Sequence, residues 1–125
     1  MKFDIERLNI MNRFELFTMI FYVLDYYWDD NQGEELSIFL SDMSPFTFAD
    51  ESSADPAVYS EFCDFIMEDK IEIDNSFELA CKYIEWINNP YVATAFEWVT
   101  QEEWNKKSQK YMESLKNSNY ANELS

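Results

Sequence analysis

The sequence predicts an all-α fold, namely an irregular single-domain bundle of five to six helices around a central N-terminal helix. The chain has 125 residues, 47% of them hydrophobic and 18% aromatic, which is enough for one core. One glycine and three prolines leave few breaks, whereas an all-β sandwich needs a turn about every ten residues. Apolar residues also recur at helical spacing along most of the chain.

The central helix is predicted from Ile10 to Trp28. Spacings of three and four residues define one apolar stripe, formed by Phe14, Phe17, Phe21, Leu24 and Trp28. An adjacent stripe consists of Leu16, Ile20, Val23 and Tyr27. Two neighbouring stripes predict a helix that is buried on more than one side. Turn-forming residues from Asp29 to Gly33 are expected to end it, with the glycine suited to a positive φ.

Two shorter helices are predicted next. The first has an apolar face of Leu36, Phe39, Leu40 and Met43, and Ser44-Pro45 ends it because the residue before proline avoids the α region. Asp55-Pro56 begins the second, since Asp accepts hydrogen bonds from free N–H groups and Pro tolerates the first helical position. The apolar stripe of this second helix is Tyr59, Phe62, Cys63, Ile66 and Met67.

The second half of the chain reads as a connector and three helices. Lys70 to Asp74 alternates like a strand but has no evident partner, so we expect an extended connector. Asn75 with Glu78 forms a capping-box pattern that starts a helix through Ile87, and Asn88-Asn89-Pro90 ends it. A helical stretch from Tyr91 to Val99 leads to a second capping box, Thr100 with Glu103. The last helix carries Trp104, Ser108, Tyr111, Met112 and Leu115 on one side. We expect one domain over residues 1–118 and a frayed tail over 119–125.

The charge is unevenly distributed along the chain. The 25 acids and 9 bases give a formal net charge of −16, yet residues 101–125 are neutral. Between Asp25 and Asp74 there are 15 acids and one base, Lys70. A field of this sign repels nucleic acid and anionic membrane, and it accelerates encounter with a basic partner. Plain solubility is the competing explanation.

The sequence offers little for catalysis. It has no histidine, so the commonest general base and most transition-metal sites are absent. Cys63 and Cys81 lie 18 residues apart at apolar positions, which indicates buried free thiols of a reducing cytoplasm. Gly33 aligned to position six of a calcium loop puts Trp28 and Phe39 at ligand positions, so that match fails. We therefore expect no enzyme, no catalytic residue, no cofactor and no metal.

The expected location is the cytoplasm. The first residues, from Met1 to Met11, lack the positive region, apolar core and cleavage site of a secretory signal. The longest apolar run, Leu16 to Leu24, is far shorter than the ~20 residues of a membrane span. A protein without membrane contact is the resulting prediction.

The segment after Pro45 is the candidate partner-binding site. It places aromatic residues inside an acidic rim, and such a surface suits a basic partner. The expected contact residues are Asp42, Phe46, Phe48, Asp50, Glu51, Asp55, Tyr59, Glu61, Asp64 and Glu68. In the competing interpretation, Phe46 and Phe48 only hold the segment against the core.

The same region resembles a known family. The residues that carry the likeness are Ser41, Asp42, Pro45, Phe46, Ser53, Ala54, Asp55, Pro56, Ala57 and Phe62. They resemble a pattern in small immunity proteins of contact-dependent growth inhibition and related polymorphic toxin systems. The resemblance implies a helical, cytoplasmic, non-enzymatic antitoxin that binds one-to-one to the toxic C-terminal domain of a delivered effector. It implies a nuclease as the toxin, such as an EndoU-type RNase.

Three other functions remain open on the sequence. An acidic chain can mimic nucleic acid and inhibit a host DNA-binding protein. Carboxylate pairs on helices could hold a metal for hydrolysis, although chance pairs are expected among so many acids. A non-catalytic helical scaffold would need its acidity only for solubility.

Overall fold

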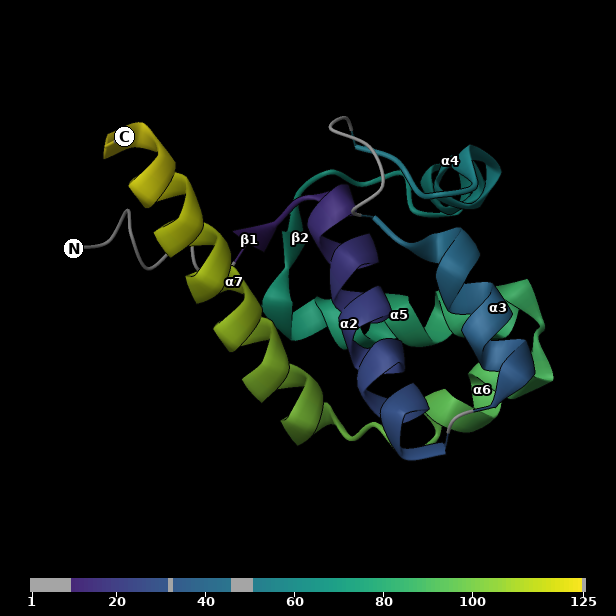
Figure 1. Cartoon of the computed structure of the whole chain (residues 1–125). Helices are drawn as coiled ribbons and strands as arrows, with labels where there is room; N and C mark the ends of the chain where they lie inside the picture. Colours follow the sequence, from purple (N-terminus) through teal and green to yellow (C-terminus); the bar gives the residue numbers. More distant parts are fainter. Residues whose placement is uncertain (1–9, 32, 46–50, 125) are drawn as a thin grey trace.

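The computed structural model describes residues 10–31, 33–45 and 51–124, without the side chains of 29–31, 112 and 114–124. Within those residues the chain forms six helices and one two-stranded sheet (Figure 1). The elements are β1 (Ile10–Met11), α2 (Arg13–Asn31), α3 (Glu34–Met43), α4 (Pro56–Phe65), β2 (Ile71–Glu72), α5 (Ile73–Ile87), α6 (Pro90–Phe96) and α7 (Gln101–Leu124). The predicted all-α class is confirmed.

Helix α2 lies at the centre of the bundle. It contacts every other helix, with α3 on one side and α7 on the other (Figure 1). Both predicted stripes contribute to the core, because Phe17 and Leu24 from one and Leu16, Ile20 and Val23 from the other are fully buried. Two adjacent apolar stripes require a helix to be buried on more than one side, and α2 is buried in this way.

The ends of α2 differ from their predicted positions. The helix begins at Arg13 because Asn12 and Glu15 form a reciprocal capping box, which leaves Ile10 outside it. Its last residue is Asn31, so the first three residues of the predicted turn segment, Asp29 to Asn31, are helical and the helix ends within that segment. Gly33 has φ −75°, and the prediction of a positive φ there is wrong. The glycine is the N-cap of α3, whose end at Met43 before Ser44-Pro45 is confirmed.

The predicted connector at 70–74 is partly a strand. Met11 pairs with Ile71 and Ile10 with Glu72 in an antiparallel register, and Met11 and Ile71 are both buried. Helix α5 follows directly from Ile73, with Glu72 as an N-cap that makes no side-chain bond. The capping box predicted at Asn75 is therefore wrong, because pairing with β1 sets where the extended chain stops.

The turns around α6 follow the sequence closely. Asn88 adopts the left-handed conformation that ends α5, with φ 54°. The Asn89 side chain accepts hydrogen bonds from the backbone N–H groups of Tyr91 and Val92, with Pro90 as the first helical residue. Helix α6 ends at Phe96, before the predicted Val99. The predicted break between α5 and α6 at Asn88-Asn89-Pro90 is confirmed.

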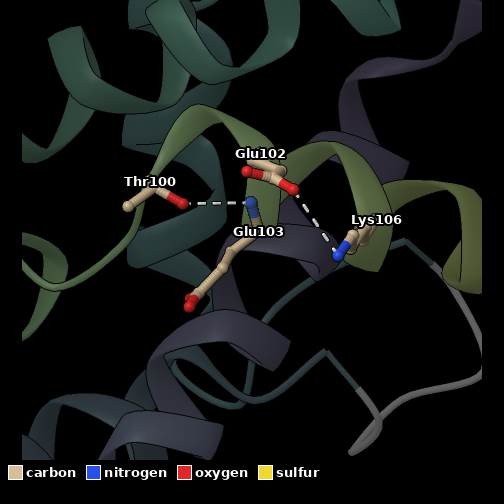
Figure 2. Close-up of polar contacts among 4 residues, drawn as sticks. All are labelled: Thr100, Glu102, Glu103 and Lys106. Atoms are coloured by element: carbon tan, nitrogen blue, oxygen red, sulfur yellow. Dashed lines mark hydrogen bonds and ion pairs between the residues drawn. The ribbon is translucent and has the colours of Figure 1, made fainter.

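Helix α7 begins with half of the predicted capping box. The Thr100 hydroxyl accepts the Glu103 backbone N–H at 3.1 Å, as Figure 2 shows. The Glu103 carboxylate does not return to Thr100; it accepts a hydrogen bond from the Tyr27 hydroxyl of α2 instead. One residue thus starts α7 through its backbone and attaches it to α2 through its side chain.

Trp104 fixes α7 to α5. Its side chain is fully buried between Phe77 and Phe96, and its indole N–H donates to the Ser76 hydroxyl at 2.7 Å. Ser76 in turn donates to the Ile73 carbonyl at 2.6 Å, so the buried indole N–H and the buried hydroxyl are both hydrogen-bonded. Ser108 is also buried and Tyr111 half-buried, as predicted, while the side chains of Met112 and Leu115 lie outside the described residues.

Three smaller expectations can be compared with the structure. Met67, predicted on the apolar stripe of α4, is 79% exposed because the helix ends at Phe65 and the chain turns away after Ile66. Cys63 and Cys81 are free thiols but only half-buried, so the prediction of buried thiols is wrong. The backbone of α7 continues beyond residue 118 to Leu124, into the range predicted as a tail.

Candidate functional site

The start of α4 is held by short-range contacts. Asp55 is the N-cap, and its carboxylate accepts the Ala57 N–H at 3.1 Å, with Pro56 as the first helical residue. Ser53 is fully buried; its hydroxyl accepts the Tyr59 N–H at 2.9 Å and donates to the Asp55 carbonyl. The predicted helix start is confirmed. The two hydrogen bonds of the Ser53 hydroxyl, which the sequence did not reveal, also stabilise it.

Two of the predicted contact residues meet where α3 ends and α4 begins. The Asp55 backbone N–H donates to the Asp42 carbonyl at 2.9 Å, and the Ala54 N–H donates to the Ser44 carbonyl at the same distance. Asp42 and Asp55 therefore lie side by side with both carboxylates exposed. Three other predicted residues, Phe46, Phe48 and Asp50, lie outside the described residues.

The remaining acids lie on α4, just before it, or between it and the first turn of α5. We define the acidic surface as the exposed carboxylates Asp42, Glu51, Asp55, Glu61, Asp64, Glu68, Asp69, Glu72 and Asp74. Lys70 is the single base between Asp42 and Asp74. Among the described residues the ion pairs are Lys82–Glu78 and Lys106–Glu102, and neither involves a member of the acidic surface. These carboxylates face solvent with their charge unneutralised by an ion pair.

Tyr59 belongs to the core more than to the surface. Its ring packs edge-on against Phe14 and Phe17, with centroids 5.3 and 5.0 Å away. Burial, followed by interaction with the Cys63 thiol, raises the pKa of the Tyr59 hydroxyl well above its ordinary value. This residue is half-buried and neutral, so it supports α4 from beneath.

A shallow hollow lies at one end of the acidic surface. It has a volume of about 460 Å³ between the α4–β2 connection and α5, and its lining includes Glu68, Lys70, Glu72 and Glu78. Within the part of the chain that the structure describes, no group of three or more Cys, Asp or Glu side chains could hold a metal ion. With three glutamates in its lining, the hollow offers a negatively charged depression to a partner's side chain.

An exposed aromatic stack next to the acidic surface escaped the sequence analysis. Trp86 on α5 stacks on Phe65 of α4 at 5.1 Å and on Tyr83 at 6.1 Å, and it remains 48% exposed. Sequence periodicity places Trp86 only at the margin of an apolar stripe. The signal was missing because Phe65 and Trp86 belong to different helices.

A second hollow, which we call the lysine groove, separates α2 from α7. It has a volume of about 550 Å³ and is lined by Tyr26, Tyr27, Glu103, Lys106, Lys107, Gln109, Lys110 and Glu113. The Lys107 ammonium lies 3.7 Å from the centroid of the Tyr26 ring. Lys106 pairs with Glu102 at 3.6 Å, one turn away on the same helix (Figure 2). Lys106, Lys107 and Glu103 of this groove thus each have a partner within the chain.

No helix in the described part of the chain is long and apolar enough to cross a membrane. Comparison of the chain with protein-family models, with curated proteins and with solved structures finds no match.

Proposed function

We propose that this chain is an immunity protein that binds a cognate toxin domain one-to-one and blocks its active or substrate-binding cleft. The toxin would be a basic nuclease, such as an EndoU-type RNase. The chain would neutralise it in the cytoplasm of the cell that it protects. The observation that carries the proposal is the acidic surface, whose carboxylates are exposed and form no ion pair with any residue that the structure describes. The family resemblance around Asp55 supports it independently.

The chemistry of a nuclease cleft matches this surface. A cleft that binds the phosphate backbone is lined with lysine and arginine, and carboxylates pair with the same groups. Opposite fields raise association rates toward ~10⁸ M⁻¹s⁻¹ at low salt, against ~10⁵–10⁶ M⁻¹s⁻¹ for neutral pairs. Speed is useful against a toxin that arrives already active.

The framework behind the surface is suited to rapid binding. Asp55 is fixed as a helix cap, Asp42 by its backbone contact with Asp55, and Asp69 by accepting the Arg13 N–H at the start of α2. Carboxylates on ordered helices lose little conformational freedom when a partner docks. A small area of contact can then yield useful affinity.

The experiment compares two triple charge reversals in the presence of the toxin domain encoded next to this gene. The first, Glu61→Lys, Asp64→Lys and Glu68→Lys, changes exposed members of the acidic surface without touching a helix cap. The control, Glu34→Lys, Glu97→Lys and Glu113→Lys, changes exposed acids elsewhere and alters the net charge equally. Measurements are the association rate as a function of salt and the survival of cells that express the toxin.

The first triple is expected to slow association by tenfold or more at low salt, to flatten the salt dependence and to reduce survival. The control should change these much less. Equal effects would mean that only the net charge matters. Full protection by the first triple would place the contact surface elsewhere, and a neighbouring toxin domain that never binds would refute the proposed function.

A further inference from the structure

The aromatic stack between α4 and α5 has an open face. Phe65 is the last residue of α4, and its ring lies 23° from parallel to the Trp86 ring. Tyr83 stacks on the same indole at 27° and is itself buried. Packing against two rings leaves Trp86 almost half exposed, so one part of the indole is anchored and the rest is open to solvent.

Anchoring makes this indole an efficient contact for a partner. A side chain that is already held by neighbouring rings loses little freedom on binding. Tryptophan is enriched among the residues that dominate interface energies, and its face attracts cations more strongly than the ring of any other aromatic side chain. By contrast, Trp98 is 66% exposed but takes part in none of the ring stacks described here.

Carboxylates lie next to the stack residues along both helices. Glu61 lies one turn before Phe65 on α4, and its charge is close enough to raise the pKa of the Tyr83 hydroxyl in addition to burial. Asp64 precedes Phe65 and Glu85 precedes Trp86, and both are exposed. The nearest base along α5 is Lys82, which is ion-paired with Glu78 at 3.5 Å. The rim of the stack is therefore negative.

We propose that the exposed face of Trp86, within this rim, is the docking point for an arginine side chain of a basic protein partner. A planar guanidinium can stack on the indole and at the same time donate paired hydrogen bonds to a carboxylate. Lysine offers a point charge and cannot do both. The inference rests on the proposed function for the identity of the partner, but its chemistry can be measured without the toxin.

The test uses the full chain and two synthetic peptides of equal length, oligoarginine and oligolysine, with dissociation constants measured by calorimetry. The unmodified protein should prefer oligoarginine. Trp86→Leu should lose about two- to fivefold in affinity for oligoarginine and most of that preference. Trp86→Tyr, which keeps a ring, should restore much of it, and Trp98→Leu should behave as the unmodified protein does. Far-UV circular dichroism checks each variant's fold.

A measurement on the unmodified protein protects the test against a misfolded variant. The indole N–H resonance of Trp86 should shift on addition of oligoarginine, and that of Trp98 should not. The proposal is overturned if Trp86 does not shift, if Trp86→Leu keeps the preference, or if Trp98→Leu loses it equally.

The outcome is separable from the proposed function. Loss of the arginine preference in Trp86→Leu, together with no protection of cells by the unmodified protein, would leave the arginine site standing and refute the immunity role. If the unmodified protein protects cells and Trp86→Leu keeps the peptide preference, the arginine site is refuted and the immunity role stands.

Discussion

The acidic surface and the lysine groove both carry charged side chains but differ in how those charges are matched. In the groove, Lys106 is paired with Glu102, Lys107 lies over Tyr26, and Glu103 accepts the Tyr27 hydroxyl. On the acidic surface, most carboxylates face solvent, and within the described residues none forms an ion pair. In the groove, Lys107 and Glu103 attach α7 to α2. The carboxylates of the acidic surface remain available to a partner.

This difference matters more than the net charge of −16. A charge that is matched within the chain contributes little to the field that a partner meets, while an unmatched cluster sets its direction. The proposed partner should therefore approach α4, and the groove should matter for stability. Four changes test that division of roles.

The largest expected effect concerns the attachment of α7. Trp104→Ala removes a fully buried ring and the hydrogen bond that the indole donates to the Ser76 hydroxyl, so we expect a loss of about 3–5 kcal/mol in the free energy of unfolding. Denaturant titration measures it. Trp98→Ala, at an exposed indole, is the matched control and should stay within about 0.5 kcal/mol. A loss below ~1 kcal/mol in Trp104→Ala would show that α7 does not depend on this contact.

Asp55 separates structural from electrostatic roles on the acidic surface. Asp55→Ala removes the N-cap of α4 and should cost about 1 kcal/mol in the free energy of unfolding. Asp55→Asn keeps a side-chain oxygen at the cap but removes the charge, so stability should change little while association with a basic partner slows. Thermal denaturation and association kinetics of both variants give the answer. Equal destabilisation by Ala and Asn would mean that the charge itself supports the fold.

Lys107 tests whether charge in the groove is structural. A double-mutant cycle of Lys107→Met with Tyr26→Leu should show a coupling of about 0.5–1 kcal/mol from the ammonium over the ring. The same cycle with Lys106→Met should show almost none, because Lys106 pairs with Glu102 at an exposed site. Similar coupling energies in the two cycles would show that the contact of Lys107 with the Tyr26 ring does not stabilise the fold.

The smallest effect is a pH dependence where α2 meets the acidic surface. Burial raises the pKa of Glu15 above its ordinary 4.5, the bond from the Asn12 backbone opposes this, and the charges of Glu51 and Asp69 add to it. A raised pKa means that the fold favours the protonated carboxyl. Its contribution to stability is full below about pH 4.5 and is lost as the pH rises through the folded value.

Glu15→Gln should abolish this contribution while retaining an oxygen for the Asn12 N–H. The difference in unfolding free energy between the variant and the unmodified protein should therefore shift in favour of the variant as the pH rises from 4 to 7. A difference that does not vary with pH would show that Glu15 titrates alike in the folded and unfolded chains.

Local chemistry made several elements predictable. Asp55-Pro56 and Thr100 each start a helix where the sequence predicts it, because a cap and its N–H partner lie within three residues. The stripes of α2 were readable for the same reason. Side chains three and four apart share a face whatever the rest of the chain does.

Contacts between distant segments were not predictable. Ile10 looked helical until its pairing with Glu72 made it a strand, and that same pairing moved the start of α5 to Ile73. The stack of Trp86 on Phe65 and the bond from Trp104 to Ser76 likewise join separate helices. No spacing along the sequence encodes which helices will touch.

The sequence by itself determined the helical class, the stops of α3 and α5 and the excess of acid, since each depends on residue identity or on neighbours along the chain. Only the tertiary structure decided which charges are matched and which face outward. Pairing is a property of distances in space, and those distances arise from burying the two stripes of α2 against five other helices.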